Sequence, residues 1–249
     1  MRVIYWAGDS TNTENKAHKF PQTGIAQAFD RFTADDVVIY NHSINGRSTK
    51  SFIDQGRLSR IAREISKDDF LFIQFGHNDE KKEDPLRYTD PDGEFIENLK
   101  RFADTAKEKG AYPVYITPVE RRLFNEDGKT LVTPSAHEPY AASVKRAAEM
   151  FDVPLVDLFT LSRQLLIREG SEASKRFYMH LKKGEAFWCR DGQIDDTHLK
   201  YAGAMAFSGL IAGELLKMEE RYASLIDASV IAALQGDLGY EDDESGQGG

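Results

Sequence analysis

Ser10 stands in the stretch Gly8-Asp9-Ser10-Thr11, directly after an apolar run at residues 2–6 that is typical of a short buried strand. Gly8 permits a tight bend, and Asp9, Ser10 and Thr11 all favour helix caps, so the strand would present Ser10 on a polar turn. Free backbone N–H groups in such a turn can stabilise an anion. Ser10 is therefore a candidate nucleophile, although a capped turn without catalysis has the same sequence.

A histidine near the other end of the chain could act as the general base for such a serine. Serine-based acyl transfer needs a base, a group that orients the base, and hydrogen-bond donors for the oxyanion. His198 is the candidate base. Asp195, three residues earlier, could reach Nδ1 of His198 if both lie on one irregular turn, and Asp196 is the alternative orienting group.

Oxyanion donors are available after two further strand-like runs. Gly46 follows the run 37–41, and Asn78 follows the nearly all-apolar run 69–75. The backbone N–H groups of Ser10 and Gly46 could bind the oxyanion, because a glycine lets the carbonyl oxygen approach the main chain. The side-chain amide of Asn78 could supply a third donor.

The elements that must position these residues alternate between β-rich runs and helical patterns, which is typical of βαβ units and a mainly parallel sheet. The expected strands cover residues 3–7, 37–41, 69–75, 113–117 and 153–157. The expected helices cover residues 22–32, 51–65, 94–109, 138–151, 158–168 and 201–218. Open parallel sheets bind ligands at the carboxyl ends of their strands, so the polar clusters after the first three strands should lie together.

The composition limits the classes of partner. The chain has 249 residues, a formal net charge of -9 and a pI of about 5.2. This charge argues against nucleic acids or anionic membranes as partners, although a local patch can oppose the net sign. The single cysteine, Cys189, excludes an intramolecular disulfide and argues against a thiol-based zinc site. No apolar run approaches the roughly 18 residues of a membrane helix.

The chain contains no visible linker or internal repeat. We expect residues 1–236 to form a single domain and the acidic, Gly-rich residues 237–249 to form a disordered tail. The N-terminus enters a strand without the basic and apolar regions of a secretory signal. These features favour a cytoplasmic protein, or a secreted one if a leader has been removed.

Four short blocks occur in order along the chain: Gly8-Asp9-Ser10-Thr11, Asn45-Gly46-Arg47-Ser48, Gly76-His77-Asn78-Asp79 and Asp195-x-x-His198. Together they resemble the sequence blocks of SGNH (GDSL-type) hydrolases, and the resemblance spans residues 1 to 217. The third block in its context, Phe-Gly-His-Asn-Asp, and the last, Asp-Asp-Thr-His, are most similar to the rhamnogalacturonan acetylesterase branch.

The resemblance implies a three-layer α/β/α, flavodoxin-like fold with a mainly parallel five-stranded sheet. It also implies a catalytic triad of Ser10, Asp195 and His198, and an oxyanion hole formed by Ser10, Gly46 and Asn78. The branch implies a serine esterase that removes acetyl groups from rhamnogalacturonan oligosaccharides without a cofactor.

The same sequence blocks are compatible with other functions. Related members act on acetylated xylan, other sugars or lipids, so an acetylxylan or other sugar acetylesterase, a lipid esterase and a thioesterase are alternatives. A carbohydrate-binding protein is the non-enzymatic alternative.

Three further residues are candidate substrate contacts. Arg47 could pair with a galacturonate carboxylate or form a surface salt bridge. His77 could shape the oxyanion loop or be a hydrogen-bonded structural histidine. Trp188, preceded by Phe187, could stack on a sugar ring or pack in the core. His77, Asn78 and Asp79 with Asp9 could also suggest a metal site, but serine chemistry needs no metal and we expect none.

Overall fold

The centre of the protein is a sheet of five parallel strands in the order β2-β1-β3-β4-β5. The computed structural model describes residues 1–230. Its strands are β1 (Arg2–Gly8), β2 (Val37–Asn41), β3 (Phe70–Gln74), β4 (Tyr112–Ile116) and β5 (Leu155–Val156). This is the strand order of flavodoxin-like folds, in which ligands bind where the strand order reverses. Because β1 lies between β2 and β3, its carboxyl end, and hence Ser10, lies at that position.

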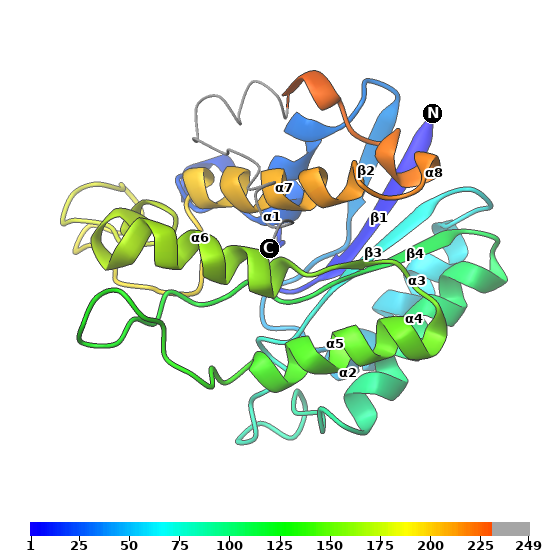
Figure 1. The fold of residues 1–249 in the computed structure, drawn as a ribbon, viewed down its shortest axis with the longest axis horizontal. Coiled ribbons are helices and arrows are strands. Elements are labelled where there is room, and N and C mark those ends of the chain that lie inside the picture. The colour runs from blue at the N-terminus through cyan, green and yellow to red at the C-terminus, as the bar shows by residue number, and fades with distance from the viewer. Residues whose placement is uncertain (231–249) are drawn as a thin grey trace, which may run out of the picture.

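Helices cover both faces of the sheet, because alternate residues of each buried strand point to opposite sides. Ile4, Trp6 and Phe72 belong to a core that the sheet shares with α1 (Ile25–Ala28) and α7 (Tyr201–Leu215). The helix α6 (Leu158–Ala173) adds Leu158, Leu165 and Leu166 to the same core. Figure 1 shows α7 above the strands and α6 to their left.

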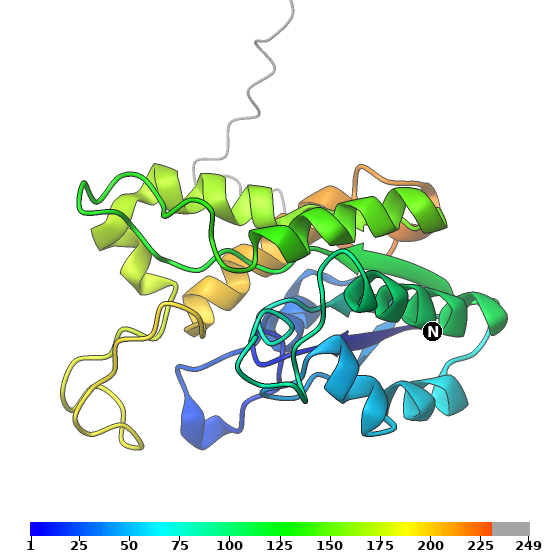
Figure 2. The ribbon, with the colours of Figure 1, turned by 90° about the horizontal axis from the view of Figure 1, so that it is seen from below.

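The opposite face carries a second core. Tyr5, Ala7 and Ile73 pack there against four helices, α2 (Thr49–Asp54), α3 (Arg57–Glu64), α4 (Glu94–Glu108) and α5 (Glu138–Phe151). Figures 1 and 2 show the resulting layers. The predicted three-layer fold with a five-stranded parallel sheet is confirmed. The expected end of the domain at residue 236 and the expected tail lie outside the described residues.

Several predicted helix bounds differ from the observed ones. The predicted helix 51–65 is divided into α2 and α3 by Gly56, whose φ of +69° is incompatible with a continuing right-handed helix. It also begins earlier, because the hydroxyl of Ser48 caps α2 by accepting a hydrogen bond from the N–H of Ser51. The predicted helix 22–32 is the short α1 followed by a 3-10 turn at Phe29–Phe32.

The last strand and its helix also differ from the prediction. β5 has only two residues, because it pairs with β4 only through Tyr115–Leu155 and Ile116–Val156. α6 continues past the predicted end at residue 168, with a bend where the backbone at Gly170 departs from helical angles.

The start of the chain lies at the edge of the sheet opposite the carboxyl ends of the strands. Arg2 begins β1, and its Nη1 donates a hydrogen bond to the carbonyl oxygen of Ser224 over 2.6 Å. Nearby, Ile226 forms a β-bridge with Thr33, a few residues before β2. Arg2 and Ser224 therefore meet at this edge, and Figure 1 marks the N-terminus there.

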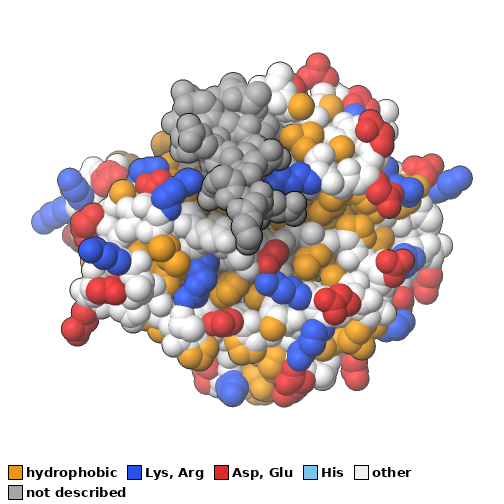
Figure 3. Space-filling view, in the orientation of Figure 1, with side chains coloured by type: hydrophobic (Ala, Val, Ile, Leu, Met, Phe, Trp, Pro, Cys, Tyr) orange, Lys and Arg blue, Asp and Glu red, His pale blue; other side chains and the backbone are white. Residues whose placement is uncertain are grey.

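The surface of the described part is mixed in charge. Lysines and arginines are interspersed with aspartates and glutamates over the face seen in Figure 3. Within residues 1–230, no helix is long and apolar enough to cross a membrane.

Candidate active site

The turn after β1 is held by the carboxylate of Asp9. One of its oxygens, Oδ1, accepts hydrogen bonds from the backbone N–H of Thr11 (2.9 Å) and from its hydroxyl (2.8 Å). Asp9 is buried, whereas Ser10 is half-buried. The buried aspartate thus fixes the turn that presents Ser10 at the carboxyl edge of the sheet.

Ser10, His198 and Asp195 form a continuous chain of hydrogen bonds. The Ser10 Oγ and His198 Nε2 atoms are 3.0 Å apart, and His198 Nδ1 lies 2.7 Å from Asp195 Oδ2. The other oxygen of Asp195 accepts from the backbone N–H groups of Thr197 (2.8 Å) and His198 (2.9 Å). These two hydrogen bonds close the irregular turn that the three-residue spacing of Asp195 and His198 requires.

Asp196, the alternative orienting group, points elsewhere. Its Oδ1 accepts from Nη1 of Arg122 over 2.6 Å and lies 2.7 Å from Nε2 of His180. Gln193 instead supports Asp195, because its side-chain amide donates to Asp195 Oδ2 over 3.1 Å. The two neighbouring aspartates thus serve different contacts, and only Asp195 contacts the His198 ring.

The pKa shifts of His198 and Asp195 suit a histidine that accepts a proton from a serine. The hydrogen bond that His198 donates to Asp195 raises the pKa of His198, against the opposing effect of burial. Burial opposes ionisation of Asp195, but the hydrogen bonds from His198 and Thr197 outweigh it and hold the pKa of Asp195 well below its usual range. The carboxylate therefore stays charged, as a group that stabilises an imidazolium must.

Gly46 and Asn78 lie on two loops that contact each other, after β2 and after β3. Gly46 has a φ of +73°, a conformation that favours glycine. The side-chain Nδ2 of Asn78 donates to the carbonyl oxygen of Arg47 over 3.2 Å, so the amide lies against the loop that carries Gly46. The loops after β1, β2 and β3 thus bring Ser10, Gly46 and Asn78 to one edge of the sheet, as the strand pattern predicts.

Arg87 is a residue that the sequence interpretation missed. Its Nη1 donates to Oδ1 of Asn78 over 3.3 Å and lies 3.9 Å from the position that a Cβ would occupy at Gly46. Its Nε donates to Asp84 Oδ2 over 2.5 Å, which fixes the guanidinium. Arg87 lies in a charged loop without regular structure, and no pattern in that loop marks this residue.

Asp79 anchors the loop after β3, which also carries Asn78. Its Oδ1 accepts from the backbone N–H of Thr49 (3.0 Å), the hydroxyl of Thr49 (2.6 Å) and the hydroxyl of Thr89 (3.0 Å). Burial raises the pKa of Asp79 to about 7, against the lowering effect of these hydrogen bonds. This carboxyl joins the loop after β3 to the start of α2.

His77 lies under the serine turn and not in an open site. It is 3% exposed, its Nδ1 faces Asp9 Oδ2 at 3.6 Å, and its ring packs on that of His137 with 4.7 Å between centroids. This packing favours the structural reading of His77 over contact with substrate. Burial raises the pKa of Asp9, but the contact with His77 and the hydrogen bonds from Thr11 outweigh it and lower that pKa.

A largely buried network of charged side chains, which no sequence pattern indicates, reaches the turn that carries Asp195 and His198. Arg121 pairs with Glu80, and its Nε donates to the hydroxyl of Thr197 over 3.1 Å. His137 lies 3.2 Å from Glu120. Thr197 immediately precedes His198, so the network holds the turn from the side of the loop after β4.

The other two predicted substrate contacts are partly engaged within the protein. Arg47 donates to Gln55 (2.6 Å) and to the carbonyl oxygen of Asn45 (3.1 Å), and it forms no ion pair within residues 1–230. Trp188 donates from Nε1 to the carbonyl oxygen of Phe20 over 3.0 Å, and Lys19 lies over its ring. The expected surface salt bridge of Arg47 is thus not formed among the described residues.

The described residues contain no group of three or more histidine, cysteine, aspartate or glutamate side chains arranged to hold a metal ion.

The sequence matches one protein-family model over most of its length. The model of the GDSL-like Lipase/Acylhydrolase family matches residues 6–206. The chain belongs to this family. The resemblance drawn from the four sequence blocks is confirmed, and with it the expectation of a carboxylic ester hydrolase.

Individual members of the family narrow the comparison. The chain is 40% identical to the rhamnogalacturonan acetylesterase RhgT of Bacillus subtilis, over 84% of this chain and 87% of that protein. It is 34% identical to the probable rhamnogalacturonan acetylesterase YesY of the same organism, over 84% of this chain and 90% of that protein. The solved structure of Axe2, an acetylxylan esterase from Geobacillus stearothermophilus, matches with a TM-score of 0.58 and 18% identity, covering 86% of this chain and 93% of that one. This last likeness concerns the fold alone.

Proposed function

We propose that this protein is a serine esterase that removes O-acetyl groups from rhamnogalacturonan oligosaccharides. The observation that carries the proposal is the hydrogen-bonded chain from Ser10 through His198 to Asp195 at the carboxyl end of β1. The similarity to the protein named as rhamnogalacturonan acetylesterase RhgT supports the choice of substrate.

In the first half-reaction, Ser10 Oγ attacks the acetyl carbonyl carbon and His198 Nε2 accepts the hydroxyl proton. The charged carboxylate of Asp195 orients the imidazole and stabilises its protonated form. The N–H groups of Ser10 and Gly46 and the amide of Asn78 donate hydrogen bonds to the tetrahedral oxyanion. Collapse of this intermediate breaks the bond to the sugar oxygen, which leaves with the proton from His198.

The second half-reaction returns the protein to its starting state. His198 takes a proton from water as the water oxygen attacks the acetyl group on Ser10. The same donors bind the second oxyanion. Its collapse breaks the bond to Ser10 Oγ, which takes the proton from His198, and releases acetic acid, which loses its proton to the solvent as acetate.

Acetate release separates this proposal from its alternatives. The wild type and Ser10→Ala should be compared on acetylated rhamnogalacturonan oligosaccharides and on acetylated xylo-oligosaccharides. Ser59→Ala, at an exposed position of α3, is the matched control. We expect fast release from the pectic substrate, abolished by Ser10→Ala and retained by Ser59→Ala.

Release from xylan fragments alone would keep the chemistry and overturn the substrate. Absence of release from both, together with failure of an organophosphonate to label Ser10 of the folded protein, would favour a carbohydrate-binding protein. Labelling of Ser10 without release would direct the search to lipid esters or thioesters.

A further inference from the structure

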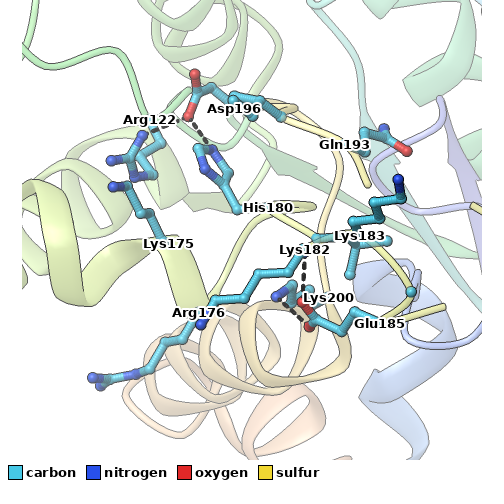
Figure 4. A pocket seen from close by; sticks show the side chains of 13 residues that line it. Arg122, Lys175, Arg176, His180, Lys182, Lys183, Glu185, Gln193, Asp196 and Lys200 are labelled. Atoms are coloured by element: carbon cyan, nitrogen blue, oxygen red, sulfur yellow. Dashed lines mark hydrogen bonds and ion pairs between the residues drawn. The ribbon is translucent and has the colours of Figure 1, made fainter. Parts of the chain in front are cut away.

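A cleft of about 1030 Å³ borders the turn that carries Asp195 and His198. Six lysines and arginines line it, against two carboxylates, although the whole chain is acidic. Figure 4 shows how these side chains surround the cleft. The charged lining residues are Arg122, Lys175, Arg176, Lys182, Lys183, Lys200, Glu185 and Asp196.

Most of these cations already have partners in the protein. Arg122 shares Asp196 with His180, and Lys200 lies 3.2 Å from Glu185. Two more pairs, Lys175–Glu172 and Arg176–Glu169, lie at the rim of the cleft. Paired groups bind a further anion less strongly, so the free cations decide what the cleft can bind.

Lys182 and Lys183 are the free cations. Within residues 1–230, no carboxylate lies within ion-pair distance of either ammonium group. Both residues are exposed, and Figure 4 shows the side chain of Lys183 extending toward Gln193. A pair of unpaired ammonium groups beside a concave surface favours an anionic ligand.

The segment that carries the two lysines is held in place. Leu181 and Gln193 exchange two backbone hydrogen bonds, of 2.8 and 2.9 Å. Oε2 of Glu185 accepts from the backbone N–H of Lys182 over 2.7 Å, which closes the turn. The lysines are thus presented from a braced loop, which lowers the entropy lost when they bind a ligand.

The cleft borders the turn that carries Asp195 and His198 through residues that flank them in the chain. Gln193 lines the cleft and also donates to Asp195. Asp196 follows Asp195 directly, and Lys200 is two residues after His198. Gln193 therefore joins the cleft to the hydrogen-bonded chain that ends at Ser10.

We infer that this cleft is a subsite for the uronate carboxylates of the oligosaccharide that flank the acetylated sugar, with Lys182 and Lys183 as its free cations. The inference rests on the proposed function, because a galacturonate-containing chain carries regularly repeated carboxylates whereas an unsubstituted xylan chain carries none. The subsite would add affinity for the charged chain and leave the chemistry at Ser10 to the triad.

The test measures binding without turnover. The full chain carrying Ser10→Ala should be titrated calorimetrically with deacetylated rhamnogalacturonan oligosaccharide and with the same oligosaccharide after reduction of its carboxyl groups to alcohols. We expect binding of the acidic ligand to be about tenfold tighter, and this preference to shrink with added salt because exposed charges are screened.

Charge-reversal variants test whether Lys182 and Lys183 cause the preference for the acidic oligosaccharide. Lys182→Glu with Lys183→Glu, on the same background, should remove it, whereas Lys182→Arg with Lys183→Arg should keep it. The matched control is Lys67→Glu with Lys109→Glu, which makes the same change in net charge at exposed positions beside the amino ends of β3 and β4. This control should keep the preference, because the change in charge is distant from the cleft.

Equal binding of the two ligands, or a preference that survives the double charge reversal in the cleft, would overturn the subsite. A preference lost equally in the matched control would also overturn it, because the effect would then come from overall charge. Failure of the proposed function is recognised separately, as absence of acetate release by the protein with Ser10 intact.

Discussion

The guanidinium of Arg87 holds the carbonyl end of the Asn78 amide, at 3.3 Å from Nη1 to Oδ1. An amide can be turned either way in a site, and this contact selects the orientation in which the donor end, Nδ2, faces the loop of Gly46. Arg87 thus fixes the orientation of Asn78, the proposed oxyanion donor, and we infer that Arg87 is a positioning residue.

The contact between Arg87 and Asn78 predicts that substitution of Asn78 lowers kcat more than substitution of Arg87. Asn78→Ala should lower kcat by about 10²–10³, because it removes an oxyanion donor. Arg87→Met should lower kcat by about tenfold, because the amide loses a charged hydrogen-bond partner. In the double variant the Arg87 substitution should add little, because its effect passes through Asn78. Turnover of an activated acetyl ester measures all three.

Arg101→Met, at an exposed position of α4, is the control for loss of an arginine. A kcat within twofold of wild type for Arg87→Met, or fully additive losses in the double variant, would contradict the positioning role.

The two adjacent aspartates should respond differently to substitution by asparagine. Asp195→Asn should lower kcat by about 10³–10⁴, because the imidazole loses the carboxylate that orients it and stabilises its charge. Asp196→Asn should have a much smaller effect on kcat and should weaken the contact with Arg122 and His180. Steady-state kinetics measures the loss of kcat in each variant, and thermal unfolding measures any loss of stability. Equal losses of kcat would contradict the assignment of Asp195.

The pH profile should reflect the raised pKa of His198. The base must be neutral to accept the proton of Ser10, and its pKa lies above the ordinary value of 6.5 because of Asp195. We therefore expect kcat/KM to rise with pH through a midpoint above 6.5, and activity to be lost below it. In Asp195→Asn the residual activity should show this midpoint at lower pH. A midpoint that does not move would show that another group controls the acidic limb.

Asp79 should make the protein less stable as pH rises. Its pKa is raised by burial from 3.8 to about 7, so the folded state prefers the protonated carboxyl. The stabilisation is complete below the unfolded pKa and is lost as pH rises through the folded one. Asp79→Asn, which cannot ionise, should show a smaller fall in Tm between pH 5 and pH 8 than the wild type.

The exposed Asp35 provides the comparison for this measurement, because Asp35→Asn makes the same chemical change on the surface. If Asp79→Asn and Asp35→Asn gave the same dependence of Tm on pH as the wild type, Asp79 would not be the titrating group.

The sequence was most informative where function depends on where strands end. Ser10, Gly46 and Asn78 each follow a buried parallel strand, and parallel strands bring such positions to one edge without further information. The three-residue spacing of Asp195 and His198 limited the orienting group to a local turn. The spacing left Asp195 and Asp196 open, and only the family resemblance favoured Asp195. The contact that engages Asp196 involves Arg122, more than seventy residues away, and so no local pattern indicates it.

The supporting residues could not be predicted for the same reason. Arg87 and Arg121 lie in irregular loops, and their contacts with Asn78 and Thr197 depend on how those loops fold over the sheet. The division of the helix at Gly56 was also missed, since a glycine can occur within a helix and only its positive φ shows that the helix ends there.

The contact between Arg2 and Ser224 has a practical consequence. It keeps the start of the chain at the edge of the sheet remote from Ser10. A fusion partner, a solid support or a carbohydrate-binding module joined ahead of Met1 would therefore leave the approach of a long polysaccharide unobstructed. Immobilisation through the N-terminus is accordingly the orientation in which a column of this protein should retain its full capacity.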